Sequence, residues 1–200
     1  MTRVVVYTEL GGPEVLHLIE VADPVAGPGQ VVVQLTAVGV NPVDGKQRSG
    51  GRVLPPIVEP RRIGYDGAGV VSEVGPGVEH LQIGERVVVT ETPGTYAERL
   101  AVDAHNAVPI PREVSDEVAA AIGTPASTAY QALRSLRVRD GDTLLIHAGS
   151  GAVGQAAIQF AVDRGATVIA TSSAAHHDRM RQLSAIPVEY GPGLLERIRA

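Results

Sequence analysis

The 200-residue sequence contains neither cysteine nor tryptophan. Without cysteine, the chain cannot form disulfides, supply a thiol nucleophile or build a zinc site that needs thiolate ligands. Aromatic residues make up only 3% of the chain, too few for the stacking platforms that bind single-stranded nucleic acids. His176 and His177 are adjacent and point away from each other on a helix, and the other four histidines are scattered. We therefore expect no metal site.

Positive charge is scarce as well. The chain has 17 Lys and Arg residues against 22 Asp and Glu residues, and its net charge is −5. A protein that binds the phosphate backbone needs a basic surface, so we expect no nucleic-acid partner. The sequence shows neither a signal-peptide core nor an apolar run long enough to span a bilayer. We expect a cytoplasmic protein that does not bind membranes.

Residues 1–115 are rich in glycine, proline and valine, which predicts an antiparallel β domain with long loops. Short runs of β-branched residues alternate there with turn signals, and β-branched side chains favour strands. The predicted strands cover residues 4–7, 31–38, 70–74 and 86–90.

Residues 116–200 alternate between strand and helix patterns, which is typical of βαβ units and a parallel sheet. Ser115 is the expected cap of an alanine-rich helix that pauses at Thr124 and Pro125, because proline disrupts helix interiors. The later predicted elements are a strand at 143–148, a helix at 152–164, a strand at 167–170, a helix at 178–184 and a strand at 188–190.

A glycine-rich loop follows the first of these strands. Gly149, Gly151 and Gly154 form a G-x-G-x-x-G pattern between an apolar strand and a helix, the context of a dinucleotide-binding loop. We expect Gly149 to allow a tight turn, Gly151 to let a pyrophosphate approach, and Gly154 to let helix and strand pack closely. Free N–H groups from Gly151 to Gly154 would face the phosphates, together with Ser150, Ala152 and Val153. The alternative is a glycine-rich turn without a ligand.

The end of the second strand indicates which nucleotide binds. An NAD site usually has an acid there to bind the ribose 2′-hydroxyl, but this chain has Thr171, Ser172 and Ser173. His177 and Arg179 follow one turn later and add donors and positive charge, which suit a 2′-phosphate. The sequence thus favours NADP(H). In the alternative interpretation, the two serines only cap the next helix.

Five further segments accompany the glycine loop in a characteristic order: 7–16, 39–44, 64–71, 94–98 and 128–133. Together they resemble the zinc-independent medium-chain dehydrogenase/reductases, in particular the quinone oxidoreductase (zeta-crystallin-like) family. Gly64-Tyr65-Asp66 stands where the zinc-dependent branch has Gly-His-Glu. The resemblance implies a GroES-like β domain over residues 1–115. Residues 116–200 would then form the N-terminal half of a Rossmann NADP-binding domain, because the family extends beyond position 200.

The resemblance also implies an activity. The family transfers a hydride from NADPH to a quinone or an α,β-unsaturated carbonyl, and its full-length members form homodimers. Since the match ends inside the second domain, a truncated, non-catalytic nucleotide-binding or interaction protein remains the alternative.

Site residues follow from the matching motifs. Asn41 resembles the asparagine beside the nicotinamide ribose and the substrate carbonyl, where its amide can both donate and accept. Lys46 is expected near a cofactor phosphate or the substrate, and Thr128 near the nicotinamide-side phosphate. Tyr190 resembles a contact to the cofactor ribose or adenine. Tyr65 or solvent would supply the proton.

Several of these residues have a structural alternative. Asn41 fits an Asn-Pro turn, and Asp44 either orients that loop or forms a local turn of its own. Lys46 fits a solvated loop, and Thr128 fits the start of a helix.

Overall fold

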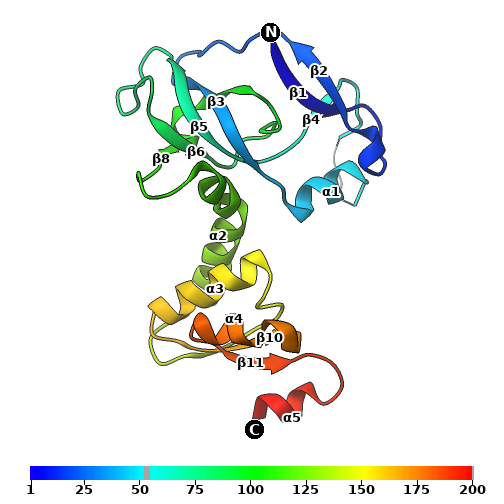
Figure 1. The fold of residues 1–200 in the computed structure, drawn as a ribbon, viewed down its shortest axis with the longest axis vertical. Coiled ribbons are helices and arrows are strands. Elements are labelled where there is room, and N and C mark those ends of the chain that lie inside the picture. The colour runs from blue at the N-terminus through cyan, green and yellow to red at the C-terminus, as the bar shows by residue number, and fades with distance from the viewer. Residues whose placement is uncertain (52–54, 200) are drawn as a thin grey trace. The chain divides into compact units, whose positions relative to one another are not determined.

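The computed structural model describes residues 1–51 and 55–199. The chain divides into two compact units, Met1–Thr124 and Pro125–Ala200, and each contains a hydrophobic core. Figure 1 shows strands throughout the first unit and alternating helices and strands in the second. None of the described helices is long and apolar enough to cross a membrane.

Unit 1 is built from two antiparallel sheets. The larger has the order β7-β3-β5-β6-β8, and the smaller has the order β2-β1-β4. The larger sheet consists of β3 (Gln30–Gly39), β5 (Asp66–Val74), β6 (Arg86–Val89), β7 (Arg99–Asp103) and β8 (Ala107–Pro109). The smaller consists of β1 (Thr2–Tyr7), β2 (His17–Val21) and β4 (Arg61–Arg62). The predicted antiparallel β domain is thus confirmed, with shorter strands added that the sequence pattern did not indicate.

Valine dominates the core of the larger sheet. Val31, Val33, Val71, Val87 and Val89 are all at most 1% exposed and pack in one cluster. Val32, which lies between two of them, is only 2% exposed, and Val88 packs against a second cluster, so both faces of the sheet are covered here. Three short helices complete this unit: η1 (Pro13–Val15), α1 (Pro42–Arg48) and η2 (Ala104–Asn106).

Helix α2 (Asp116–Leu136) is continuous through Pro125, so the predicted pause was wrong. Its start is as expected, because the Ser115 hydroxyl accepts the Val118 N–H at 3.3 Å. At the proline, the backbone N–H of Thr124 donates to the carboxylate of Asp66 at 2.9 Å. A side chain from β5 thus supplies an acceptor for an amide next to the proline, where intrahelical bonding is disturbed.

The start of α2 packs with unit 1. Ala119 and Ala120 form a buried cluster with Ala68 of β5. The two compact units accordingly divide inside α2, at Thr124 and Pro125, whereas the sequence composition changes where the helix begins.

Unit 2 is a three-stranded parallel sheet with the order β11-β10-β9 and helices that pack on it. This is the expected order for the first three strands of a doubly wound fold. The strands are β9 (Thr143–Ile146), β10 (Thr167–Ser172) and β11 (Ile186–Glu189). The helices are α3 (Ala152–Asp163), η3 (Ala174–His176), α4 (His177–Gln182) and α5 (Leu194–Arg199). Leu133 of α2 is buried with Ile158, Val168 and Met180, so the second half of α2 belongs to this core.

Candidate functional site

Asn41 lies at the junction of β3 and α1, in unit 1. Its backbone is extended, and Pro42 occupies the first helical position, where a missing N–H costs nothing. The Asp44 carboxylate accepts the backbone N–H of Asn41 at 2.8 Å, the reciprocal bond of a helix capping box. Both residues are buried. Asn41 therefore forms the Asn-Pro turn, and this turn is also where the candidate site residue lies.

The side-chain amide of Asn41 is held by Asp66. Its Nδ2 donates to Asp66 Oδ2 at 2.8 Å, and the same oxygen accepts the Thr124 N–H. The amide is thus not free to donate with its whole NH₂ group, as the family motif alone would suggest. One N–H is committed to a buried carboxylate, and the side-chain oxygen faces the Asp44 backbone N–H in the capping box. The second N–H and the remaining lone pair of the oxygen are left for a ligand.

Two glycines make room for this arrangement. A Cβ on Gly123 would lie 2.5 Å from Asp66 Oδ1, and a Cβ on Gly39 would lie 2.3 Å from the carbonyl oxygen of Ala120. Both distances are well inside van der Waals contact. Glycine at these positions therefore lets α2 approach β3 and β5 closely enough for Asp66 to reach the helix backbone.

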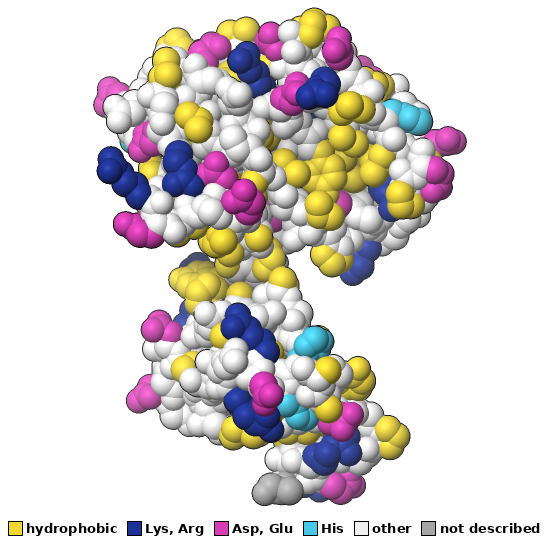
Figure 2. Space-filling model, in the orientation of Figure 1, with side chains coloured by type: hydrophobic (Ala, Val, Ile, Leu, Met, Phe, Trp, Pro, Cys, Tyr) yellow, Lys and Arg dark blue, Asp and Glu magenta, His cyan; other side chains and the backbone are white. Residues whose placement is uncertain are grey.

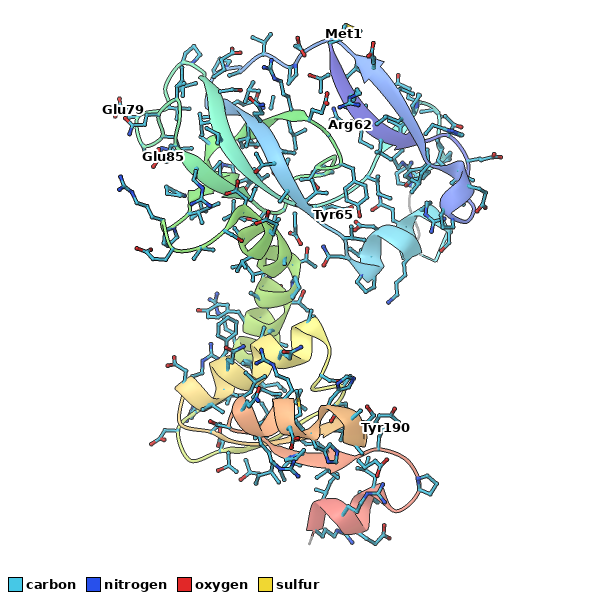
Figure 3. All side chains as sticks on the ribbon, viewed as in Figure 1. Met1, Arg62, Tyr65, Glu79, Glu85 and Tyr190 are labelled. Atoms are coloured by element: carbon cyan, nitrogen blue, oxygen red, sulfur yellow. The ribbon has the colours of Figure 1, made fainter. Side chains whose placement is uncertain are left out.

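Two tyrosines flank the same segment. The Tyr96 hydroxyl donates to Asp44 Oδ2 at 3.0 Å, and burial together with the nearby Asp44 and Asp66 carboxylates raises the pKa of Tyr96. The Tyr65 hydroxyl donates to Gln47 Oε1 of α1 at 2.8 Å, and Figure 3 shows Tyr65 beside the start of that helix. Lys46 is exposed on α1. Asn41 and Tyr65 are thus fixed around α1, whereas Lys46 points to solvent.

An apolar hollow of about 470 Å³ also lies in unit 1. Arg3 and Glu98 form an ion pair at this hollow. Tyr96 lines the hollow as well, so the residue whose hydroxyl bonds Asp44 also borders the hollow. Hydrophobic side chains gather on the visible face of this unit in Figure 2. The remaining lining residues are Val5, Leu18, Leu35, Thr36, Ala37, Val38 and Ala97.

The glycine loop of unit 2 differs from expectation in two details. The left-handed residue is Ala148, with φ 55°, and not Gly149. Gly149 is instead required for packing, because its Cβ would lie 2.8 Å from the Ala170 side chain and 3.1 Å from the Met180 sulfur. The N–H of Gly151 is not free, since it donates to the Ala148 carbonyl at 3.0 Å.

The expected anion site remains at the first turn of α3. The first N–H groups of a helix have no partner within it, and here they belong to Ala152, Val153 and Gly154. Gly154 is buried, and its Cβ would lie 2.3 Å from the Ala148 carbonyl oxygen, as expected for a close helix–strand contact. Gly151 is exposed, and its Cβ would only touch that oxygen at 3.4 Å. Its missing side chain leaves open space beside these N–H groups, which fits a phosphate.

The residues at the end of β10 are partly committed to the fold. Thr171 is buried and its hydroxyl accepts the Ala148 N–H at 3.1 Å, so it braces the glycine loop. Ser172 is also buried and donates to the Ser173 carbonyl at 3.1 Å. Arg179 is exposed and its Nε donates to Gln155 of α3 at 3.0 Å, next to the loop.

His177 and Ser173 lie close in sequence on the segment after β10. The His177 Nε2 is buried and has no hydrogen-bond partner in the part of the chain that the structure describes. Ser173 begins η3 without a side-chain capping bond. Tyr190 is 60% exposed just after β11 (Figure 3), and Thr128 is exposed in the middle of α2, not at a helix start.

Comparison with known proteins bears on the family. The alcohol dehydrogenase GroES-like domain profile matches residues 27–112. The quinone oxidoreductase of Homo sapiens is 38% identical over 175 residues, which cover 86% of this chain and 53% of the human protein. A structure of Escherichia coli quinone oxidoreductase complexed with NADPH superposes with a TM-score of 0.84 at 32% identity, over 95% of this chain and 58% of that one. The chain belongs to the quinone oxidoreductase family of medium-chain dehydrogenase/reductases.

A structure described as an NAD-dependent alcohol dehydrogenase superposes with a TM-score of 0.90 at 35% identity, over 98% of this chain and 66% of that one. The shared fold therefore does not by itself decide between NAD and NADP. The chain spans about half the length of the curated relatives it matches.

The division into two compact units separates the predicted residues into two groups. Asn41, Lys46 and Tyr65 lie in unit 1, and the residues from Thr128 to Tyr190 lie in unit 2. No group of three or more His, Cys, Asp or Glu residues in the described ranges is arranged to hold a metal ion.

Four side chains or backbone positions in these groups have roles that the sequence did not predict: Gln47, Tyr96, Ala148 and Gln155. Tyr96 lies in a recognised family segment, but nothing in its spacing indicates the Asp44 bond.

Proposed function

We propose that this chain supplies the substrate domain and the phosphate-binding half of a reductase that passes a hydride from NADPH to a quinone or an α,β-unsaturated carbonyl. The observation that carries the proposal is the first turn of α3, where unpartnered helix N–H groups lie beside the open space at Gly151. The family match supports the reaction class, because the human and Escherichia coli relatives are quinone oxidoreductases.

The residues of unit 2 would hold the nucleotide. Ala152, Val153 and Gly154 offer backbone N–H groups to the pyrophosphate, with Ser150 and Gly151 forming the approach. Arg179, together with Ser173 and His177, would receive a 2′-phosphate, because these groups supply charge and donors where an NAD site usually has an acid. Thr171 and Ser172 act indirectly in this proposal, by bracing the loop and the strand end.

The nicotinamide supplies the hydride when NADPH is bound. In unit 1, Asn41 would orient a ligand through the part of its amide that Asp66 does not occupy. The Tyr65 hydroxyl donates its single O–H to Gln47, and it must turn from Gln47 to act as the proposed proton donor to the developing oxyanion, with solvent as the alternative source. Thr128, Lys46 and Tyr190 are proposed contacts to the cofactor. The reaction uses no zinc, and full-length relatives are proposed to be cytoplasmic homodimers.

The test is a titration of the 200-residue chain with NADPH and, in parallel, NADH, followed by addition of 1,4-benzoquinone or an enone. The chain has no tryptophan, so the emission of bound NADPH is measured without energy transfer from that residue. Tighter binding of NADPH than NADH, followed by oxidation of NADPH, supports the proposal. Binding without oxidation favours a non-catalytic nucleotide-binding role, and absence of binding contradicts the proposed phosphate site.

A further inference from the structure

Asp66 is a buried acid for which hydride transfer has no direct use. Its residue is 1% exposed, and none of the ion pairs found among the described residues includes it. A carboxylate in such a place needs hydrogen bonds to replace those it made to water. It receives them from the Asn41 side chain at 2.8 Å and the Thr124 backbone at 2.9 Å, both on Oδ2. The carboxylate thus joins the end of β3 to α2.

The chemistry of this contact decides which way the Asn41 amide faces. The oxygen and nitrogen of an asparagine side chain are nearly isosteric, so the surrounding partners must distinguish them. An ionised carboxylate only accepts hydrogen bonds, and the end of the amide that faces it must therefore be the NH₂ group. The carbonyl oxygen of Asn41 is consequently directed away from Asp66.

We propose that Asp66 is a positioning residue that fixes this orientation, so that Asn41 presents its carbonyl oxygen to a donor group of the bound nucleotide or substrate. The matching ligand group is a hydroxyl, such as that of a ribose, or an amide N–H. The identity of the ligand in this inference rests on the proposed function, whereas the orientation of the Asn41 amide does not. Without the carboxylate, only the capping-box contact of the Asn41 oxygen with the Asp44 N–H favours this orientation, so the amide turns over more often into the state that does not accept the ligand donor.

The composition of the chain makes the orientation measurable. The sequence contains only two asparagines, Asn41 and Asn106, so labelling with ¹⁵N-asparagine gives two side-chain NH₂ signals in the full chain. The Asn106 Nδ2 donates at 3.3 Å to the hydroxyl of Thr92, in another part of unit 1, and serves as an internal reference. Substituting Asn106→Gln removes its signal and so assigns both.

Three variants separate orientation from folding. Asp66→Leu removes the acceptor. Asp66→Asn keeps a neutral oxygen that can still accept, with a weaker bond than a carboxylate. Asp116→Asn is the matched control, because Asp116 also bonds a helix region to the sheet, through Thr36 and Arg86, but lies outside the proposed site.

We expect one Asn41 side-chain proton of the wild type to exchange slowly with solvent. In Asp66→Leu its exchange should accelerate at least about tenfold, because hydrogen bonds to charged acceptors are strong. Asp66→Asn should give an intermediate rate, and it decides the question if the leucine variant does not fold. The Asn106 signal and the Asp116→Asn spectrum should stay as in the wild type. Equal rates for Asn41 in all variants, or parallel acceleration of both asparagines, would overturn the proposal.

Addition of NADPH tests the ligand separately. The proposal predicts that NADPH shifts the Asn41 signals in the wild type and shifts them less in Asp66→Asn. Equal shifts in both proteins would overturn the positioning role. If NADPH fails to shift Asn41 even in the wild type, the proposed function of Asn41 is wrong, while the exchange rates still decide whether Asp66 orients the amide.

Discussion

Gly151 and Gly154 belong to the same three-glycine pattern, but the structure gives them different tasks. An alanine Cβ at position 154 would lie 2.3 Å from the Ala148 carbonyl oxygen and 2.7 Å from the Gly149 Cα. These are backbone atoms, which cannot turn aside as a flexible side chain can. An alanine Cβ at position 151 would meet only the Ala148 oxygen, at 3.4 Å, which is ordinary contact. The Gly151 backbone, with φ −72° and ψ 163°, also suits alanine.

Gly154→Ala is therefore expected to destabilise unit 2, and Gly151→Ala is not. Forcing a methyl group into a packed contact costs about 1–3 kcal/mol, and the backbone clash places this variant near the upper end. For a domain of this size, about 3 kcal/mol lowers Tm by roughly 12–24 °C. Gly151→Ala should instead keep Tm within about 2 °C, since a surface change is usually worth at most about 0.5 kcal/mol. It should nevertheless weaken NADPH binding at least about tenfold, or about 1.4 kcal/mol, because its methyl group occupies the phosphate approach.

Thermal unfolding followed by circular dichroism gives Tm, and the fluorescence of bound NADPH gives Kd. The reasoning about the loop fails if Gly154→Ala is as stable as the wild type. It also fails if Gly151→Ala folds normally and binds NADPH with an unchanged Kd. A wild-type chain that does not bind NADPH would contradict the phosphate site itself, whatever the stabilities of the variants.

Three other predictions concern side chains of unit 1 and the α3 surface. Hydrogen bonds from Thr36 and Arg86 lower the pKa of Asp116, so its contribution to stability is present above about pH 4 and is lost as the pH falls through its lower folded-state pKa. Denaturant unfolding of Asp116→Asn should accordingly show a smaller loss of stability on acidification than the wild type, and equal losses would contradict this. Because the pKa of Tyr96 is raised, tyrosinate absorbance should show one late-titrating group that Tyr96→Phe removes, and an unchanged titration curve would refute the assignment. The stability that comes from this raised pKa is lost as the pH rises above about 10. Gln155→Ala frees the Arg179 guanidinium and should change the ratio of NADPH to NADH affinity, without changing Tm by more than about 2 °C. A constant ratio would show that this bond to Arg179 does not affect the choice between the two nucleotides.

The sequence predicted the fold class because local signals and tertiary packing agree along most of the chain. The valine runs became β3, β5 and β6, and the alternating segments after Gly141 became the expected parallel sheet. The prediction failed at Pro125, where the helix continues and the neighbouring amide finds an acceptor 58 positions away in sequence. Such a contact leaves no periodicity that a single sequence would show.

The candidate site was predictable only in part, for the same reason. Asn41 and Gly151 can be identified from motifs, but whether their N–H groups are free to bind a ligand depends on their hydrogen-bond partners in the fold. Asp66 takes one N–H of Asn41, and the Ala148 carbonyl takes the Gly151 N–H. These partnerships depend on how strands and helices approach one another, which the motif spacing does not specify.

Ala148 carries a further consequence for the glycine loop. Its left-handed backbone, at φ 55°, costs an alanine about 1–2 kcal/mol relative to the right-handed region, and glycine would adopt it freely. The same methyl group also limits the shapes that the loop can visit when nothing is bound to it. A less varied free loop loses less conformational entropy when it closes around a phosphate. At this position the chain thus gives up some folding stability, and the proposed phosphate loop has fewer conformations to lose on binding than it would have with glycine.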